Sequence, residues 1–228
     1  MTKIEWCDEV WNPIVGCTPI SEGCDHCYAK RIATRFDYGG WDGMASFHAD
    51  RIGKPTRWRK PLHIFVNSMG DLFHESVPFD WLENVWNVMR DCPRHIFMIL
   101  TKRPHSMAQW LGGSPGSRTL PNVWLGVTAE NHARWMERVP YLLRCPAAVR
   151  FVSVEPMLGP MPGRDLAGIS WVVCGAETGQ GKRPMQISWY NNLRDQCAKA
   201  GVRFFGKKDS DGKPLPDRRW PQHSHGVA

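Results

Sequence analysis

The chain has 228 residues, of which 42% are hydrophobic and 22% are charged, and these ordinary proportions exclude a largely disordered protein. Lys and Arg total 29 against 22 Asp and Glu, a formal net charge of +7, which favours an anionic partner such as nucleic acid or a nucleotide. We expect a cytoplasmic protein without membrane contact, since neither a signal-peptide segment nor a membrane-length apolar run is present. In that reducing compartment the 8 cysteines favour metal chemistry over disulfides.

The first predicted strand is short, Ile14–Val15, and a cysteine-rich loop over residues 17–27 follows it directly. The next predicted element is a helix, Tyr28–Phe36, which begins beside the last cysteine. Its apolar residues share one face at helical spacing, and they are Ala29, Ile32, Ala33 and Phe36. The cysteines are therefore expected between a strand and a helix.

The loop carries Cys17, Cys24 and Cys27 in a C-x6-C-x2-C pattern. Three thiolates on so short a segment can bind one inorganic centre together. A four-iron cluster held by three cysteines keeps one iron open for another ligand. A tetrahedral zinc ion would instead need a fourth protein ligand such as Cys7 or His26. The pattern alone also allows a structural zinc knuckle or three unrelated buried cysteines.

A long segment over residues 37–62 is predicted to be irregular, with clustered positive charge towards its end. Arg57, Trp58, Arg59 and Lys60 can contact phosphates and stack on a base. A solvated loop anchored by Trp58 explains the same residues equally well.

Six apolar runs then recur along the chain, and their β-branched and aromatic residues predict strands. Because these runs are almost continuously hydrophobic, each strand is expected to be buried on both faces. They are residues 63–67, 95–100, 123–127, 149–154, 171–174 and 202–205.

Helices are predicted between these strands. Asp80 is expected to cap one helix, with Glu83 completing a capping box, and Ser188 to cap another. Residues 104–111 and 130–143 are two further candidates. The alternation of strand and helix predicts an α/β fold, a partial parallel (β/α) barrel of about six to seven strands or an open sheet. We expect one barrel-like domain over residues 1–209, followed by a polar tail over residues 210–228.

Polar residues follow each predicted strand, where the ends of parallel strands meet at one rim. The cysteine loop belongs to the same rim. This coincidence predicts a functional site there, with candidates including Asn67, Ser68, Asp71, Thr101, Lys102, Arg103, Thr128, Glu130, Glu155, Glu177 and Lys207.

A cysteine loop after the first strand of a βα barrel resembles the layout of the radical S-adenosylmethionine enzymes. Several longer runs are similar to those of an uncharacterised, phage-associated family with a three-cysteine motif. These runs are FVNSMGDLF at 65–73, LTKRP at 100–104, WLGVTAEN at 124–131, SVEPMLGP at 153–160 and GAETG at 175–179.

The resemblance implies a [4Fe–4S] cluster on Cys17, Cys24 and Cys27, with S-adenosylmethionine on the open iron. An external electron donor would then permit release of a 5′-deoxyadenosyl radical that abstracts hydrogen from a substrate. By position, the resemblance implies that the cosubstrate is bound by His26, Ser68, Asp71, Lys102, Glu155 and Glu177. It assigns no catalytic residue. The first cysteine interval is six residues instead of the superfamily's common three, and no Gly-Gly-Glu triplet follows the second strand.

The sequence thus predicts a radical S-adenosylmethionine-type enzyme that acts on nucleic acid or a nucleotide. The rival hypotheses are a non-catalytic, zinc-stabilised nucleic-acid-binding protein and a redox sensor whose iron–sulfur cluster is fully ligated, with Cys7 as the fourth ligand.

Overall fold

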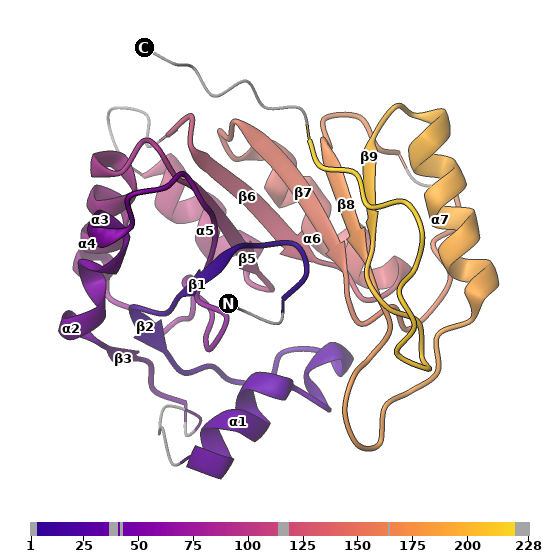
Figure 1. The fold of residues 1–228 in the computed structure, drawn as a ribbon, viewed down its shortest axis with the longest axis horizontal. Helices are drawn as coiled ribbons and strands as arrows, with labels where there is room; N and C mark the ends of the chain where they lie inside the picture. Colours follow the sequence, from indigo (N-terminus) through magenta and orange to yellow (C-terminus); the bar gives the residue numbers. More distant parts are fainter. Residues whose placement is uncertain (1–3, 37–40, 42, 114–118, 164, 222–228) are drawn as a thin grey trace.

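The computed structural model describes residues 4–36, 41, 43–113, 119–163 and 165–221. Seven parallel strands form a sheet that curls into half of a barrel (Figure 1), in the order β1-β4-β5-β6-β7-β8-β9. This confirms the predicted partial (β/α) barrel. The strands are β1 (Glu9–Trp11), β4 (His63–Val66), β5 (Ile96–Thr101), β6 (Val123–Thr128), β7 (Val149–Val154), β8 (Trp171–Cys174) and β9 (Arg203–Gly206).

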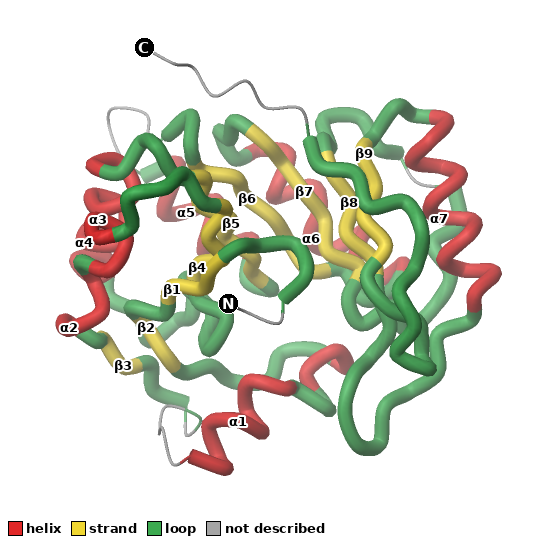
Figure 2. The backbone as a smooth tube through the Cα atoms, viewed as in Figure 1, coloured by secondary structure: helices red, strands yellow, loops and turns green. Residues whose placement is uncertain are grey.

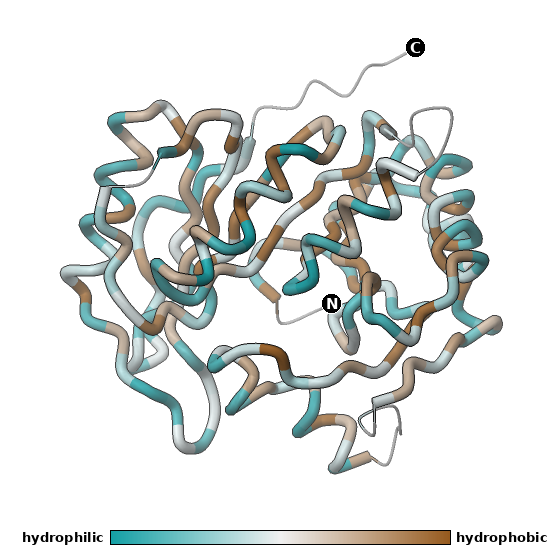
Figure 3. The backbone as a smooth tube through the Cα atoms, turned by 180° about the vertical axis from the view of Figure 1, so that it is seen from behind, coloured by the Kyte–Doolittle hydropathy of each residue, from teal (hydrophilic) through white to brown (hydrophobic). Residues whose placement is uncertain are grey.

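Helices follow most of the strands, and most of them cover the outer face of the curled sheet (Figure 2), whereas the described residues between β7 and β8 form no helix. Seen from behind, the helices carry hydrophilic and hydrophobic residues side by side, as expected for helices with one buried face (Figure 3). The helices are α1 (Tyr28–Phe36), α2 (Ala49–Ile52), α3 (Lys54–Arg57), α4 (Phe79–Asp91), α5 (Pro104–Gly112), α6 (His132–Arg144) and α7 (Ile187–Lys199), with a short 3-10 helix at Glu22–Cys24. No helix within the described residues is long and apolar enough to cross a membrane.

The sheet separates two hydrophobic cores. Successive side chains of a strand point to opposite faces, so Phe97 and Ile99 of β5 join the outer core under the helices. Ile96 and Met98 point into the curl, where they join an inner core rich in aromatic rings. Both faces of the strands are therefore buried, as their continuous hydrophobicity predicts.

The prediction of the first strand was wrong. β1 is formed by Glu9–Trp11, which pairs in parallel with β4, and Ile14–Val15 is β2, which pairs antiparallel with β3 (Ser46–Phe47). Trp11 is fully buried, and its indole N–H donates to the carbonyl of Arg51 at 2.9 Å. Pro13 separates the two strands, because proline lacks the N–H that a continuing strand would need.

Two predicted helix caps were also wrong. α4 begins at Phe79, one residue before Asp80, because the carbonyl of Pro78 accepts from the N–H groups of Trp81 at 3.1 Å and Leu82 at 3.4 Å. α7 begins at Ile187, and Gln186, not Ser188, occupies the cap position. Neither cap makes a side-chain hydrogen bond, so the backbone turn alone starts each helix.

The predicted face of α1 is only partly buried, because Ala29 and Ala33 are covered while Ile32 and Phe36 are exposed.

The segment before β4 is more regular than predicted, since it contains β3, α2 and α3. Trp58 is half-buried and lies edge-on to His95 at 6.1 Å, while Arg57, Arg59 and Lys60 are exposed. This agrees with a solvated segment anchored by Trp58. Residues 37–40 and 42 of the predicted loop lie outside the described residues.

The described part of the predicted tail, residues 210–221, packs on the domain. Arg218 forms an antiparallel bridge with Phe205 of β9, and Leu215 is buried. Trp220 stacks on Trp171 with ring centroids 5.1 Å apart. This segment therefore covers the β9 edge of the sheet, and residues 222–228 lie outside the described residues.

Candidate functional site

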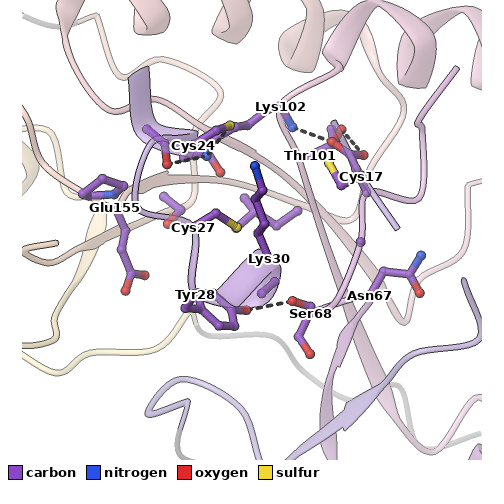
Figure 4. Close-up of a pocket in the computed structure, with 18 of the residues that line it drawn as sticks. Cys17, Cys24, Cys27, Tyr28, Lys30, Asn67, Ser68, Thr101, Lys102 and Glu155 are labelled. Carbon is purple, nitrogen blue, oxygen red and sulfur yellow. Dashed lines mark hydrogen bonds between the residues drawn. The ribbon is translucent and has the colours of Figure 1, made fainter. Parts of the chain in front are cut away.

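A cavity of about 210 Å³ opens at the carboxyl ends of the strands. The inward side chains there lie next to one another on adjacent strands. Thr128 of β6 pairs with Ser153 of β7, and Ser153 pairs with Val173 of β8. The cavity is lined by all nine cluster and cofactor residues expected from the sequence, namely Cys17, Cys24, His26, Cys27, Ser68, Asp71, Lys102, Glu155 and Glu177. Figure 4 labels six of them, Cys17, Cys24, Cys27, Ser68, Lys102 and Glu155.

Two of the three thiols have a cation beside them. The Lys102 ammonium lies 3.7 Å from the sulfur of Cys24, and an Arg103 guanidinium nitrogen lies 3.5 Å from the sulfur of Cys17. Burial raises the pKa of Cys24, but the charge of Lys102 and nearby hydrogen bonds outweigh burial, so the net pKa is lowered. Burial, reinforced by Asp71, raises the pKa of Cys17 to about 12 although Arg103 opposes it. Cys17 is thus a thiol that a bound metal would have to deprotonate.

The donor set can be compared with the ligands that a zinc ion and a cluster require. No group of three or more His, Cys, Asp or Glu side chains within the described ranges is gathered closely enough to hold one metal ion. A zinc ion needs its sulfur ligands at about 2.3 Å, whereas the cysteines of a cubane bind different irons. Cys7 does not line the cavity but packs in the inner core. The nitrogen Nδ1 of His26 is bonded to Glu177 at 2.9 Å. Three thiols line one cavity, and as a donor set they are compatible with a three-cysteine cluster.

Arg103 links the cysteine loop to the segment that follows β4. Its side chain is 3% exposed and donates to both oxygens of Glu75 at 2.9 and 2.8 Å, to the carbonyl and hydroxyl of Thr18 at 3.1 and 2.8 Å, and to Asp71 at 3.3 Å. We call this arrangement the inner clamp. Burial lowers the pKa of Arg103, but Asp71 and the other anions outweigh burial and raise it.

Asp71 is the anchor of the inner clamp. Besides Arg103, it accepts from the Thr101 hydroxyl at 2.7 Å and from the backbone N–H groups of Lys102 and Phe73 at 3.1 and 3.0 Å. Both of its oxygens are therefore engaged by donors of the protein itself.

The 3-10 turn of the loop rests on a buried carboxylate. Glu130 is fully buried, and it pairs with Arg138 at 3.0 Å and Lys102 at 3.4 Å. Ser21 donates to it at 2.5 Å. A Cβ added to Gly23 would lie 2.3 Å from an oxygen of Glu130, so only glycine fits at this position. Glu130 therefore fixes the position of the loop relative to the sheet.

Arg183 ties the same loop down from its outer side. Its side chain is 32% exposed and pairs with Glu177, with Asp25 at 3.0 Å, and with the carbonyl of Glu22 at 2.8 Å. His26 also bonds to Glu177. We call this arrangement the outer clamp. Burial raises the pKa of Glu177, but hydrogen bonds from Arg183 and His26 outweigh burial and lower it to about 2.

The remaining predicted residues also have partners within the protein. Glu155 pairs with Lys207, and Glu177 pairs with Arg183. The Ser68 hydroxyl donates to Asn12 at 3.1 Å, and its carbonyl accepts from the Tyr28 hydroxyl at 2.9 Å.

Sequence reasoning missed several residues of the cavity, among them Trp6, Lys30 and Ser153. Lys30 of α1 points into it (Figure 4), and the C-x2-C-Y-A-K spacing, one helical turn beyond Cys27, was the available signal. Ser153 lies within β7, one position before the strand ends, inside the run that the sequence predicts as an apolar strand. Its polarity in that run was the signal.

Neither a curated protein nor a solved structure matches the chain. A family model described as "Protein of unknown function (DUF5131)" matches residues 1–219. Because this match spans nearly the whole sequence, the chain belongs to the DUF5131 family.

Proposed function

We propose that the protein is a radical S-adenosylmethionine-type iron–sulfur enzyme of the cytoplasm. The observation that carries the proposal is the meeting of three loop thiols with polar side chains from six strand ends in one cavity. In a parallel barrel this end of the strands is where active sites are built.

In this proposal Cys17, Cys24 and Cys27 hold a [4Fe–4S] cluster, and its fourth iron is open to S-adenosylmethionine. Cluster and cosubstrate, when bound, supply one-electron chemistry that begins with hydrogen abstraction from a substrate. An external electron carrier delivers the electron.

The residues of the chain orient these groups and keep water out. Lys102 and Arg103, at 3.7 and 3.5 Å from two of the sulfurs, offset the negative charge of the thiolates. The cosubstrate is oriented by the cavity-lining side chains His26, Ser68, Lys102, Glu155 and Glu177, while Asp71, whose oxygens are both engaged, acts through the residues that it holds in place. Leu100, Phe65 and Trp6 form the apolar wall behind them.

We assign nucleic acid or a nucleotide as the substrate. The net charge of +7 favours an anionic ligand, and Lys30 and Lys102 place two ammonium groups at the cavity. Electrostatic attraction of this kind strengthens binding to a phosphate-bearing substrate and weakens as salt is added.

The test is an anaerobic purification followed by iron and zinc analysis and electron paramagnetic resonance of the reduced protein. We expect about four irons per chain and a signal that shifts when S-adenosylmethionine is added. The signal should be lost in Cys24→Ala and kept in Cys145→Ala, which removes a buried thiol far from the loop in sequence and outside the cavity lining.

Two other results would replace the proposal. One zinc per chain without iron would indicate a zinc-stabilised binding protein. A four-iron signal that ignores S-adenosylmethionine would indicate a redox sensor or a structural cluster.

A further inference from the structure

Helix α1 carries an exposed row of apolar side chains. Tyr28, Ile32 and Phe36 are 39%, 37% and 56% exposed. Their spacing of four residues places them one after another along a single side of the helix. Ala29 and Ala33, which are buried, form the neighbouring side. The row therefore borders the buried side of α1 and remains accessible, although two of its three members are aromatic.

Cations flank this row. Arg31 and Arg35 are exposed and four residues apart, and each lies three positions from a member of the row. The Arg35 guanidinium lies over the Phe36 ring, 5.4 Å from its centroid. Neither arginine forms an ion pair within the described part of the chain, and α1 contains no acidic residue. Aromatic rings and cations thus share one side of the helix, and we call it the α1 surface (Tyr28, Arg31, Ile32, Arg35 and Phe36).

The α1 surface begins at the cavity. Tyr28 lines the cavity, and its hydroxyl donates to the carbonyl of Ser68 at 2.9 Å, which holds the ring at the cavity wall (Figure 4). Lys30, in the same turn, points into the cavity. The rest of α1 extends away from it, apart from the helices on the outer face of the sheet (Figure 1). A ligand bound along α1 would therefore reach the cavity at one end.

The length and chemistry of the α1 surface match a polynucleotide. From Tyr28 to Phe36 the helix rises about 12 Å, and successive nucleotides of a stacked strand are about 3.4 Å apart, so the surface has room for a few nucleotides. Bases stack on aromatic side chains, and Arg and Lys contact the phosphates between them. A strand without a complement offers its base faces freely, whereas the bases of a duplex are stacked on one another.

From this combination we infer that the α1 surface binds single-stranded nucleic acid and leads one nucleotide into the cavity. The inference deepens the proposed function, because it selects a polynucleotide over a free nucleotide and gives the strand a path. It rests on that function only for the reaction in the cavity, since binding along α1 requires no cluster.

The test measures the fluorescence anisotropy of a fluorescein-labelled single-stranded DNA of about 15 nucleotides as full-length protein is added. We expect saturable binding that weakens as salt is added, and weaker binding of the same sequence as a duplex. No binding of the single strand, or a duplex bound equally well, would overturn the inference.

Iron is quantified on the same sample, which separates the two proposals. A protein that binds the strand without iron would contradict the cluster and leave the α1 surface supported. A four-iron protein that does not bind the strand would contradict only the α1 surface.

Phe36→Ala tests the stacking contribution. Loss of one stacked base should weaken binding of the strand about tenfold. Because Phe36 is 56% exposed, the free energy of unfolding should stay nearly unchanged. Phe79→Ala is the matched control, since Phe79 is 64% exposed at the start of α4, and it should change neither quantity. Wild-type affinity in Phe36→Ala would overturn the inference.

Arg35→Gln tests the phosphate contact. The slope of log affinity against log salt should become shallower by about 0.7, the value for one phosphate of a single strand. Arg144→Gln removes the same charge from the end of α6, where the guanidinium also lies over an aromatic ring, that of Tyr141 at 5.5 Å. This control should keep the wild-type slope. Equal changes in both variants would mean that net charge, not the α1 surface, attracts the strand.

An anionic membrane surface is the rival partner for a basic helix with an apolar row. Cosedimentation with vesicles of phosphatidylcholine and phosphatidylserine tests it. We expect Phe36→Ala to leave vesicle binding unchanged. Vesicle binding that is lost in Phe36→Ala, with DNA binding unaffected, would assign the α1 surface to membranes and overturn the inference.

Discussion

The cysteine loop is held by two clamps of similar chemistry in different surroundings. In each clamp an arginine joins acidic side chains to a backbone carbonyl of the loop, through Thr18 in the inner clamp and Glu22 in the outer one. Arg103 is 3% exposed, whereas Arg183 is 32% exposed. In the outer clamp water reaches Arg183 and Asp25, although Glu177 is buried; in the inner clamp it reaches Glu75 but neither Arg103 nor Asp71. Loss of the arginine should therefore lower the free energy of unfolding more in the inner clamp than in the outer one.

The largest effect is expected from Arg103→Ala. The change leaves Asp71, which is 7% exposed, without its cation and frees the carbonyl of Thr18. Removal of one partner of a buried ion pair costs roughly 3–5 kcal/mol, so the free energy of unfolding should fall by about that amount. Urea unfolding followed by circular dichroism measures it. Arg90→Ala, at an exposed position of α4, is the control and should cost less than about 0.5 kcal/mol. If Arg103→Ala costs no more than Arg183→Ala, burial does not distinguish the clamps.

Gly23→Ala should have an intermediate effect and tests the support between the clamps. The new methyl group would lie 2.3 Å from an oxygen of the fully buried Glu130, so the loop or the Glu130–Arg138 pair must shift. Overpacking of this kind costs about 1–3 kcal/mol in urea unfolding. Gly112→Ala is the matched control, because a Cβ there meets nothing within 4 Å. It should stabilise the protein slightly or leave it unchanged, and equal losses in both variants would refute a special role for Gly23.

Arg183→Ala should have the smallest effect, about 1 kcal/mol at pH 7, and a characteristic pH dependence. In the folded protein the pKa of Glu177 is lowered from 4.5 to about 2, where hydrogen bonds from Arg183 outweigh the opposing effect of burial. A carboxylate with a depressed pKa contributes stability above its unfolded pKa and loses that contribution as the pH falls through its folded pKa.

The difference between wild type and Arg183→Ala should therefore be constant above about pH 4.5 and shrink towards pH 2. Urea unfolding at intervals from pH 2 to pH 7 provides the comparison. A difference that persists undiminished at pH 2 would mean that Glu177 is not the partner that matters.

The strands could be predicted because burial on both faces leaves a continuous apolar run that no other element explains. The first strand escaped because Glu9–Trp11 is short and mixed, and only its pairing with β4 makes it a strand. The caps at Asp80 and Ser188 failed for a related reason. Asp80 and Ser188 belong to residue types that cap isolated helices well, but the backbone turns at Pro78 and Gln186 start these two helices. Local propensity sets the residue at which a helix begins only where tertiary contacts favour no other boundary.

The position of the candidate site could be predicted, since topology alone gathers the strand ends. Its pairings could not. Ser21 and Glu130 are 109 positions apart in the sequence, and Glu22 and Arg183 are 161 positions apart. Neither contact can therefore be inferred from spacing along the chain. Ser153 was hidden for the opposite reason, because its neighbours made it look like one more residue of a buried strand.

A half-barrel, unlike a closed barrel, keeps two edge strands, and each edge offers unpaired backbone groups to any other extended chain. At the β9 edge this protein uses its own C-terminal segment, which bridges Phe205 through Arg218 and stacks Trp220 on Trp171. The segment thus covers backbone groups through which two molecules could otherwise associate. A shortened chain that ends at residue 209 would present an open β9 edge and a bare indole ring, and its main defect would be aggregation.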